Sequence, residues 1–277
     1  MKRIARQEDG GVIKDVHGPG FVRHRTGRYW IDRTKKLGTV IPNEIILAEL
    51  HELLDRDFGR SSARRSLLDL GAGTQPYAPL YRKYFDQTVT VDVPHSPHDT
   101  SAVDITASAD SLPFESQSFD FVLCTEVVEH CPDPRRVFQE IARVLKPEGC
   151  AFVTTPLMVG LHEEPFDFYR FTPYGLRDLA ERAGLTTEYV RPKGGYGPVL
   201  MLLLQWPVTK VWQAVQRHTQ LPVYHSANPL LYFPVVLPQL MYVWWWKRHR
   251  ERSDLRTMSK RLTRTTLGYV AVFRKAP

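Results

Sequence analysis

A short apolar segment, 66–70, ends in a glycine-rich turn, and this junction constrains the fold more than any other part of the chain. The segment reads SLLDL and is followed by Gly71, Ala72 and Gly73, and about twenty residues later a second apolar segment ends in Asp92. In an open α/β sheet this spacing places a carboxylate beside the glycine turn, where it can accept hydrogen bonds from two ribose hydroxyls. The sequence therefore predicts a pocket for a nucleoside cofactor.

Extended apolar segments alternate with helical patterns along most of the chain, as they do in parallel α/β sheets. Val137, Ile141 and Val144 fall on one helical face, as expected for a helix that packs on a sheet. The sequence therefore predicts the α/β class with a doubly wound, mostly parallel sheet. We expect strands at 66–70, 88–92, 119–124, 150–155 and 268–274, helices at 76–85, 134–144 and 172–183, and another helix that begins near residue 41.

The glycine turn leaves open which nucleoside binds. The dinucleotide-binding motif uses a third glycine three residues after the second, and Pro76 stands at that place. Because the contact with a pyrophosphate would be lost, the sequence disfavours a dinucleotide. The structural alternative is a tight turn that binds no ligand.

Further motifs follow the glycine turn in a fixed order over about 67–190. Together they resemble those of the class I S-adenosylmethionine-dependent methyltransferases, in the broad group that includes quinone and small-molecule methylating enzymes. The resemblance implies a Rossmann-like sheet with an antiparallel last strand, S-adenosyl-L-methionine as cofactor and S-adenosyl-L-homocysteine as product. The motifs are LDLGAG at 68–73, Asp92, SLPF at 111–114, SFDFV at 118–122, TEVVEH at 125–130 and RVLKPEG at 143–149.

The resemblance also implies which residues hold the cofactor. Two positions depart from the family's pattern. Gln75 replaces the third glycine of its first motif, and Ser108 stands where the family has an acid near the adenine amino group, so Ser108 or the Ala109 backbone would serve there. The implied cofactor-binding residues are Asp69, Gly71, Ala72, Gly73, Asp92, Ser108, Ala109 and Glu126.

Two histidines are candidates for catalysis. Transfer of an activated methyl group is an in-line displacement, so the protein mainly positions the acceptor, and a general base helps when the acceptor is a hydroxyl. His130 follows the strand at 119–124 and His162 follows the strand at 150–155, at the sheet edge where open α/β folds bind ligands. Alternatively, His130 caps a turn and contacts the cofactor.

The segment around His162 is dense in groups that suit a polar acceptor. Glu164, Asp167 and Arg170 are the candidate substrate-binding residues, with Arg170 placed to orient an anionic acceptor. The pattern resembles a subset of bacterial methyltransferases associated with cell-surface polysaccharide synthesis. Alternatively, the acidic residues form a solvated loop or hold Arg170 in an ion pair. We expect no metal, because the second histidine of a metalloprotease helix is absent.

The chain carries 37 basic and 30 acidic residues, a formal net charge of +7. This balance suits an anionic partner or a membrane surface, or is simply a solvated basic surface. The basic residues are dispersed and no nucleic-acid-binding module accompanies them, so we expect no nucleic-acid partner. Three cysteines without metal spacing, and a charged N-terminus without an apolar core, indicate a reduced, cytoplasmic protein.

An apolar and aromatic insertion separates the expected last strand from the preceding segments. The run 229–246 has no charged residue, is broken by Pro234 and Pro238, and ends in three tryptophans beside a basic cluster. A membrane span, as in an integral scaffold, is therefore disfavoured, whereas peripheral, in-plane attachment at the cytoplasmic membrane face fits the pattern. The alternative is a lid or a dimer interface. We divide the chain into a lead-in at 1–40, a methyltransferase domain at 41–194 plus 264–277 and a hydrophobic, helical insertion at 195–263, with 198–250 as the membrane contact.

These features predict a methyltransferase that O-methylates a lipid-linked or polyprenyl-linked small molecule or a surface-glycan intermediate. C-methylation of a quinone precursor is the alternative reaction. A non-catalytic nucleoside-binding module is the alternative class.

Overall fold

The structure is a computed structural model. It describes 40–59, 65–204, 241–242, 244 and 265–277, together with two short strands near the N-terminus. These strands, β1 (Val22–Arg23) and β2 (Tyr29–Trp30), pair antiparallel within the expected lead-in. Most of the expected insertion lies outside the described residues.

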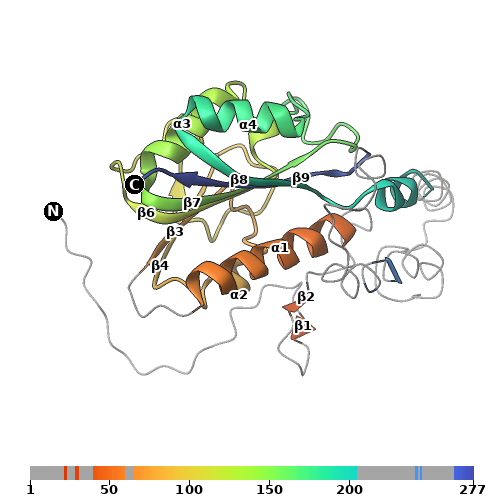
Figure 1. Ribbon diagram of the computed structural model, residues 1–277, viewed down its shortest axis with the longest axis horizontal. Coiled ribbons are helices and arrows are strands. Elements are labelled where there is room, and N and C mark those ends of the chain that lie inside the picture. The colour runs from red at the N-terminus through yellow and green to blue at the C-terminus, as the bar shows by residue number, and fades with distance from the viewer. Residues whose placement is uncertain are drawn as a thin grey trace.

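A seven-stranded sheet forms the centre of the molecule, in the order β5-β4-β3-β6-β7-β9-β8 (Figure 1). β9 pairs antiparallel with both of its neighbours, and the other pairings are parallel. This arrangement confirms the expected α/β sheet with one antiparallel strand. The strands are β3 (Ser66–Leu70), β4 (Gln87–Asp92), β5 (Ile105–Thr106), β6 (Phe119–Thr125), β7 (Leu145–Pro156), β8 (Leu185–Pro192) and β9 (Gly268–Lys275).

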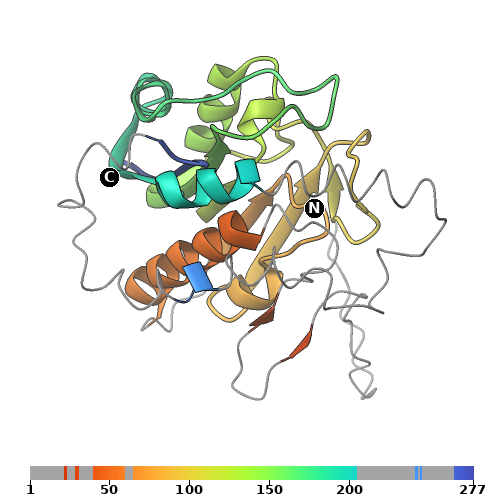
Figure 2. The same cartoon turned by 90° about the vertical axis from the view of Figure 1, so that its right-hand side faces the viewer.

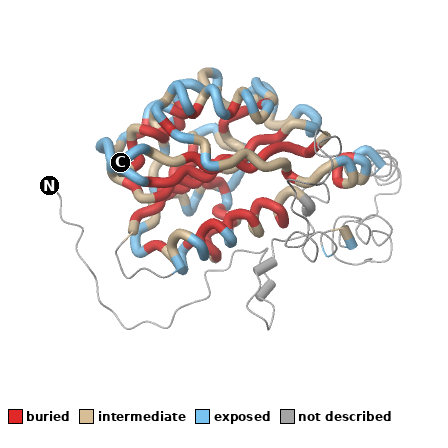
Figure 3. The backbone as a smooth tube through the Cα atoms, in the orientation of Figure 1, coloured by how far each residue is buried: buried red, intermediate tan, exposed pale blue. Residues whose placement is uncertain are grey.

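Helices cover both faces of the sheet, so its central strands are buried on both sides (Figures 1 and 3). α1 (Val40–Phe58) and α2 (Ala78–Tyr81) lie on one face, and α3 (Pro134–Val144) and α4 (Pro173–Arg182) lie on the other. Adjacent residues of β3 point to opposite faces of the sheet: Leu67 joins the core under α1, and Leu68 joins the core under α3. The strands therefore read as continuous apolar runs.

Local sequence signals explain where the helices on the second face begin. The Asp133 carboxylate accepts a hydrogen bond from the Arg135 N–H, and the Thr172 hydroxyl accepts one from the Gly175 N–H. Each cap is followed by a proline at the first helical position, where the missing N–H is not needed. Gly184, with φ of +82°, follows the end of α4.

Several boundaries differ from the sequence expectation. The helix expected at 76–85 is short, and only 78–81 are helical. β7 begins at Leu145, five residues before the start of the strand expected at 150–155. The strands β5 and β8 were not expected, because neither segment has a long apolar run.

The described beginning of the expected insertion is helical at 196–204 and packs on α1. Val199 forms a small core with Ile45 and Leu267, and Leu202 and Tyr242 pack against that core. Figure 2 shows this helix beside α1 at one end of the sheet. Within the described residues, no helix is both long enough and apolar enough to cross a bilayer.

An aromatic cluster joins α1 to the sheet, and its removal should destabilise the fold. The fully buried Phe121 ring of β6 lies 5.5 Å from the rings of Phe58 and Phe85. We expect Phe121→Ala to lower the free energy of unfolding by about 3–5 kcal/mol, measured by chemical denaturation. Phe168→Ala, at a ring that is 44% exposed, is the matched control and should cost less than about 1 kcal/mol. Equal losses in the two variants would contradict this account of the core.

Candidate functional site

The candidate site lies where the parallel strands end, at the right-hand side of Figure 1. The glycine turn follows β3, and its backbone is left-handed, with φ of +71° at Gly71 and +48° at Gly73. A Cβ atom at Gly71 would lie 2.2 Å from Cγ2 of Val127, in the loop after β6. Glycine is therefore required here both by the backbone angle and by the close approach of the next loop.

Asp92 ties the end of β4 to the glycine turn. One carboxylate oxygen accepts a hydrogen bond from the Gly73 N–H at 2.7 Å, and the other accepts one from the Val93 N–H at 2.7 Å. The N–H groups of Gly71 and Ala72 both donate to the Val91 carbonyl. The structure thus brings together four of the residues predicted to bind the cofactor: Asp92, Gly71, Ala72 and Gly73.

Gln75 occupies the place of the family's third glycine and adopts the backbone angle of a glycine, with φ of +55°. Left-handed angles cost a non-glycine residue roughly 1–3 kcal/mol at such sites. The side chain offsets this cost, because its amide nitrogen donates to the Ala102 carbonyl and its amide oxygen accepts from Arg82. The turn therefore keeps its path without the glycine.

Asp69, the acidic residue of β3, is 2% exposed, and its Oδ2 atom has no hydrogen-bond partner among the described residues. Burial is the main cause that raises the pKa of this carboxyl to about 7. The Tyr81 hydroxyl opposes the rise, and the nearby charge of Asp92 adds to it. A buried, unsatisfied carboxyl beside a glycine turn is an available acceptor or donor for a ligand group.

Glu126 opens the loop after β6 with a left-handed φ of +55°. Its Oε1 atom accepts hydrogen bonds from Thr154 Oγ1 at 2.6 Å and from Lys193 Nζ at 2.5 Å. Lys193 was not identified as a site residue from the sequence. The available signal was its place directly after the extended segment 185–192. Lys193 is 1% exposed, and its ammonium forms an ion pair with the Glu126 carboxylate, whose side chain is 33% exposed.

Ser108 and Ala109 lie next to the end of β4, where the Ala107 N–H donates to the Asp92 carbonyl. Ser108 is exposed and forms an isolated bridge with Ser111, whereas Ala109 is buried. Their role near an adenine stays a prediction.

The two candidate bases lie side by side although they come from different loops. The rings of His130 and His162 are 4.8 Å apart at their centroids and nearly perpendicular. His130 Nδ1 lies 2.7 Å from the Phe166 carbonyl, and its Nε2 atom lies 3.7 Å from Glu129 and from Glu163. A carbonyl can only accept, so Nδ1 of His130 carries the hydrogen and Nε2 of the neutral ring has a free lone pair.

The predicted substrate-binding residues are only partly brought together. Asp167 accepts two hydrogen bonds from Arg170 and one from the His162 backbone, and these contacts hold the pKa of its carboxyl well below its usual range. The ion pair that the sequence left as an alternative is therefore present. Glu164 is exposed, so its role in acceptor binding stays a prediction.

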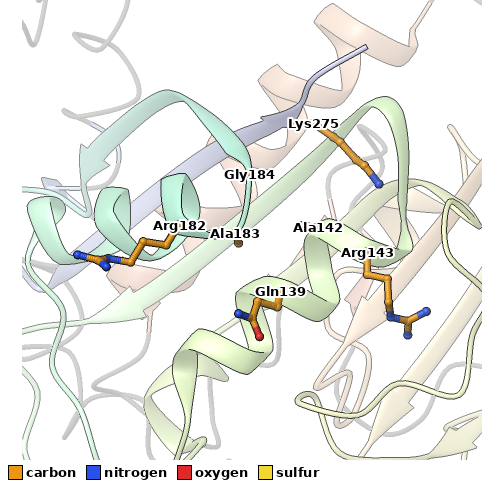
Figure 4. A pocket seen from close by; sticks show the side chains of 7 residues that line it. All are labelled: Gln139, Ala142, Arg143, Arg182, Ala183, Gly184 and Lys275. Carbon is orange, nitrogen blue, oxygen red and sulfur yellow. The ribbon is translucent and has the colours of Figure 1, made fainter.

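A separate hollow of about 440 Å³ lies at the other end of the sheet (Figure 4). It lies near Lys275, which pairs with the first residue of β8. It contains none of the predicted site residues and is lined by Gln139, Ala142, Arg143, Arg182, Ala183, Gly184 and Lys275.

Known proteins resemble the chain over this same region. The family described as a methyltransferase domain matches residues 68–153. An uncharacterized methyltransferase of Mycobacterium sp. (strain JLS) is 30% identical over 193 residues, which cover 65% of this chain and 68% of that protein. An uncharacterized methyltransferase of Bacillus subtilis (strain 168) is 33% identical over 103 residues, which cover 31% of this chain and 39% of that protein.

The chain belongs to the class I S-adenosylmethionine-dependent methyltransferases. A solved structure, a putative sarcosine dimethylglycine methyltransferase from Galdieria sulphuraria, shares the fold of this methyltransferase with a TM-score of 0.50 and 21% identity, over 86% of this chain and 85% of that one.

The geometry fits the cofactor, S-adenosylmethionine, which supplies a methyl group on a positively charged sulfur. The glycine turn exposes backbone where a side chain would intrude, and Asp92 holds that turn while keeping lone pairs for ribose hydroxyls. Asp69, with its unsatisfied Oδ2 atom, stays a predicted further contact. Which of these atoms touch the cofactor stays a prediction.

Adding one methyl group at Gly71 should abolish most cofactor binding. In Gly71→Ala the new Cβ atom would overlap Val127, so the loop after β6 must shift away from the glycine turn. We expect the affinity for S-adenosylmethionine, measured by calorimetry, to fall at least about tenfold, or about 1.4 kcal/mol. Gly160→Ala is the matched control, because nothing lies within 4 Å of its added Cβ atom. Unchanged binding by Gly71→Ala would show that the turn does not contact the cofactor.

Asp69 should make the methyltransferase less stable as pH rises. Its pKa is about 7 in the folded protein against 3.8 ordinarily, so the folded protein holds this proton more tightly and loses stability as the carboxyl ionises. From about pH 5.5 to 8 this group should lower the free energy of unfolding by about 2 kcal/mol. The free energy of unfolding of Asp69→Asn should not show this loss between about pH 5.5 and 8. It is measured by urea denaturation of the protein without cofactor. An identical pH dependence in the two proteins would mean that Asp69 is already ionised at the lower pH.

Proposed function

We propose that this methyltransferase O-methylates a hydroxyl group of a lipid-linked acceptor. The observation that carries the proposal is where large apolar side chains are exposed. Those that the structure describes all fall within 158–174, 196–204 and 241–244. The first two segments follow the ends of β7 and β8, so they belong to the same sheet edge as the cofactor turn.

The exposed apolar side chains flank the candidate bases. Leu161, which precedes His162, is 74% exposed, and Phe168 is 44% exposed. On the helix at 196–204, one face packs on α1 while Leu203 and Leu204 are 61% and 63% exposed. Exposed apolar side chains concentrated at one edge favour contact with a lipid chain or a bilayer surface. This contact would be peripheral.

The histidines supply the chemistry that a hydroxyl acceptor needs. The free Nε2 lone pair of His130 or His162 takes the hydroxyl proton while the acceptor oxygen displaces the methyl group from sulfur. The C–O bond forms, the C–S bond breaks, and the proton ends on the imidazole. Asp167 is placed to orient His162, since its carboxylate lies 3.4 Å from His162 Nδ1.

The proposal is tested with methyl-labelled S-adenosylmethionine and a whole-cell extract, by partitioning the products between organic solvent and water. We expect label in the organic phase. Replacing Leu161 and Phe168 together by serine should lower that label at least about tenfold while cofactor affinity stays unchanged, because these side chains lie outside the glycine turn.

Asp92→Asn is the control that removes cofactor binding, and it should abolish label in both phases. Label found only in water would overturn the lipid-linked acceptor and point to a soluble metabolite, glycan or macromolecule. No label in either phase, with cofactor bound, would favour the non-catalytic alternative.

A further inference from the structure

The loops after β6 and β7 bring a third polar group to the two histidines. Glu129, His130 and His162 each offer one ligand atom, and the three atoms all lie within 4.8 Å of one another. Two ligands on opposite sides of one ion lie about 4.2 Å apart when each bond is about 2.1 Å long. Ligand atoms up to 4.8 Å apart must therefore move closer together to share one ion.

Glu129 has a buried carboxylate that the protein does not satisfy. Its side chain is 0% exposed, and neither oxygen has a hydrogen-bond partner among the described residues. His130 Nε2 lies 3.7 Å from Glu129 Oε1, and the positive charges of Lys193 and Arg170 also act on this carboxyl. A buried carboxylate without donors costs several kcal/mol unless a partner or an ion accompanies it, on the order of 3–5 kcal/mol.

Both histidines are oriented as metal ligands usually are. His130 Nδ1 faces the Phe166 carbonyl at 2.7 Å, and His162 Nδ1 lies 3.2 Å from the Gly160 carbonyl and 3.4 Å from Asp167 Oδ2. A ligating histidine commonly donates one ring N–H to a carbonyl or carboxylate, which leaves the other nitrogen for the ion. Each ring therefore keeps its Nε2 lone pair available.

We propose that Glu129, His130 and His162 bind a divalent transition-metal ion. Two imidazoles and one carboxylate suit Zn²⁺, Mn²⁺, Fe²⁺ or Co²⁺ better than the hard cations Mg²⁺ and Ca²⁺, which prefer oxygen ligands. Glu163 lies close enough to join, with Oε2 3.7 Å from His130 Nε2. The three ligands leave positions open for water or for an oxygen of another molecule.

This site departs from the sequence expectation of no metal, which considered only two histidines on one helix. The ligands here come from separate loops that the fold brings together. Where the site serves the proposed O-methylation, which is an additional assumption, the histidines act as ligands instead of bases. The ion then lowers the pKa of a bound acceptor hydroxyl, and the displaced proton leaves to water.

The test uses the full chain without a histidine tag, freed of metal by dialysis against a chelator. Titration with Co²⁺ is followed by its visible absorption, and Zn²⁺ is added in competition. We expect one ion per chain and a rise in the thermal unfolding temperature when the ion is present. His162→Ala and Glu129→Gln should each weaken binding by about 100-fold or more.

His51→Ala is the matched control, since His51 lies on the exposed surface of α1, beside Asp55, and should leave the affinity unchanged. His162 is partly exposed, so His162→Ala should fold as the parent does, which its unfolding temperature without metal checks. No Co²⁺ absorption, or equal affinity in all variants, would overturn the site.

The same measurements separate this site from the proposed function. Co²⁺ binding without label in the organic phase would leave the metal site standing and refute the lipid-linked acceptor. Label in the organic phase from a chain that binds no Co²⁺ would support the lipid-linked acceptor and refute the metal site.

Discussion

The candidate site depends on the hydrogen bond from the Gly73 N–H to the Asp92 carboxylate. This bond fastens the turn after β3 to the end of β4 at a distance of 2.7 Å. A charge-assisted bond of this kind, removed from water, is stronger than a neutral one. The position of Val127 against Gly71, and so the path of the loop carrying Glu126, Glu129 and His130, follows from where this turn is held.

An ion pair organises the opposite side of the same edge. Lys193, just beyond β8, reaches Glu126 after β6, and its side chain passes so close to Gly268 that a Cβ atom there would lie 2.6 Å from Cε. Strands far apart in the sequence are thereby joined at the site. Glu126 can hold its left-handed backbone angle because Thr154 and Lys193 both bind its carboxylate.

The sequence was sufficient for those parts of the molecule that local patterns determine. The β3 bounds and the α3 bounds were predicted as they stand, because an apolar run before glycines and a proline after a capping aspartate are local signals. β8 was not predicted, because its residues 186–188 are polar and it is held by pairing with the distant β9.

The same distinction applies to the candidate site. Asp92 and the glycine turn were recognisable because their spacing is fixed by one strand-turn-strand unit. The Lys193–Glu126 pair and the approach of His162 to His130 depend on how separate loops meet, which no spacing along the chain encodes. At Gln75, two hydrogen bonds hold the side chain while the backbone keeps a glycine-like angle.

The order of the strands bears on how the chain acquires its fold during synthesis on the ribosome. β9 lies between β7 and β8, yet β8 ends at Pro192 and β9 begins only at Gly268. A nascent chain made as far as Pro192 therefore carries β8 without a strand to pair with. One edge of β7 stays open to other extended segments during that interval, a condition that favours misassembly and recruits chaperones.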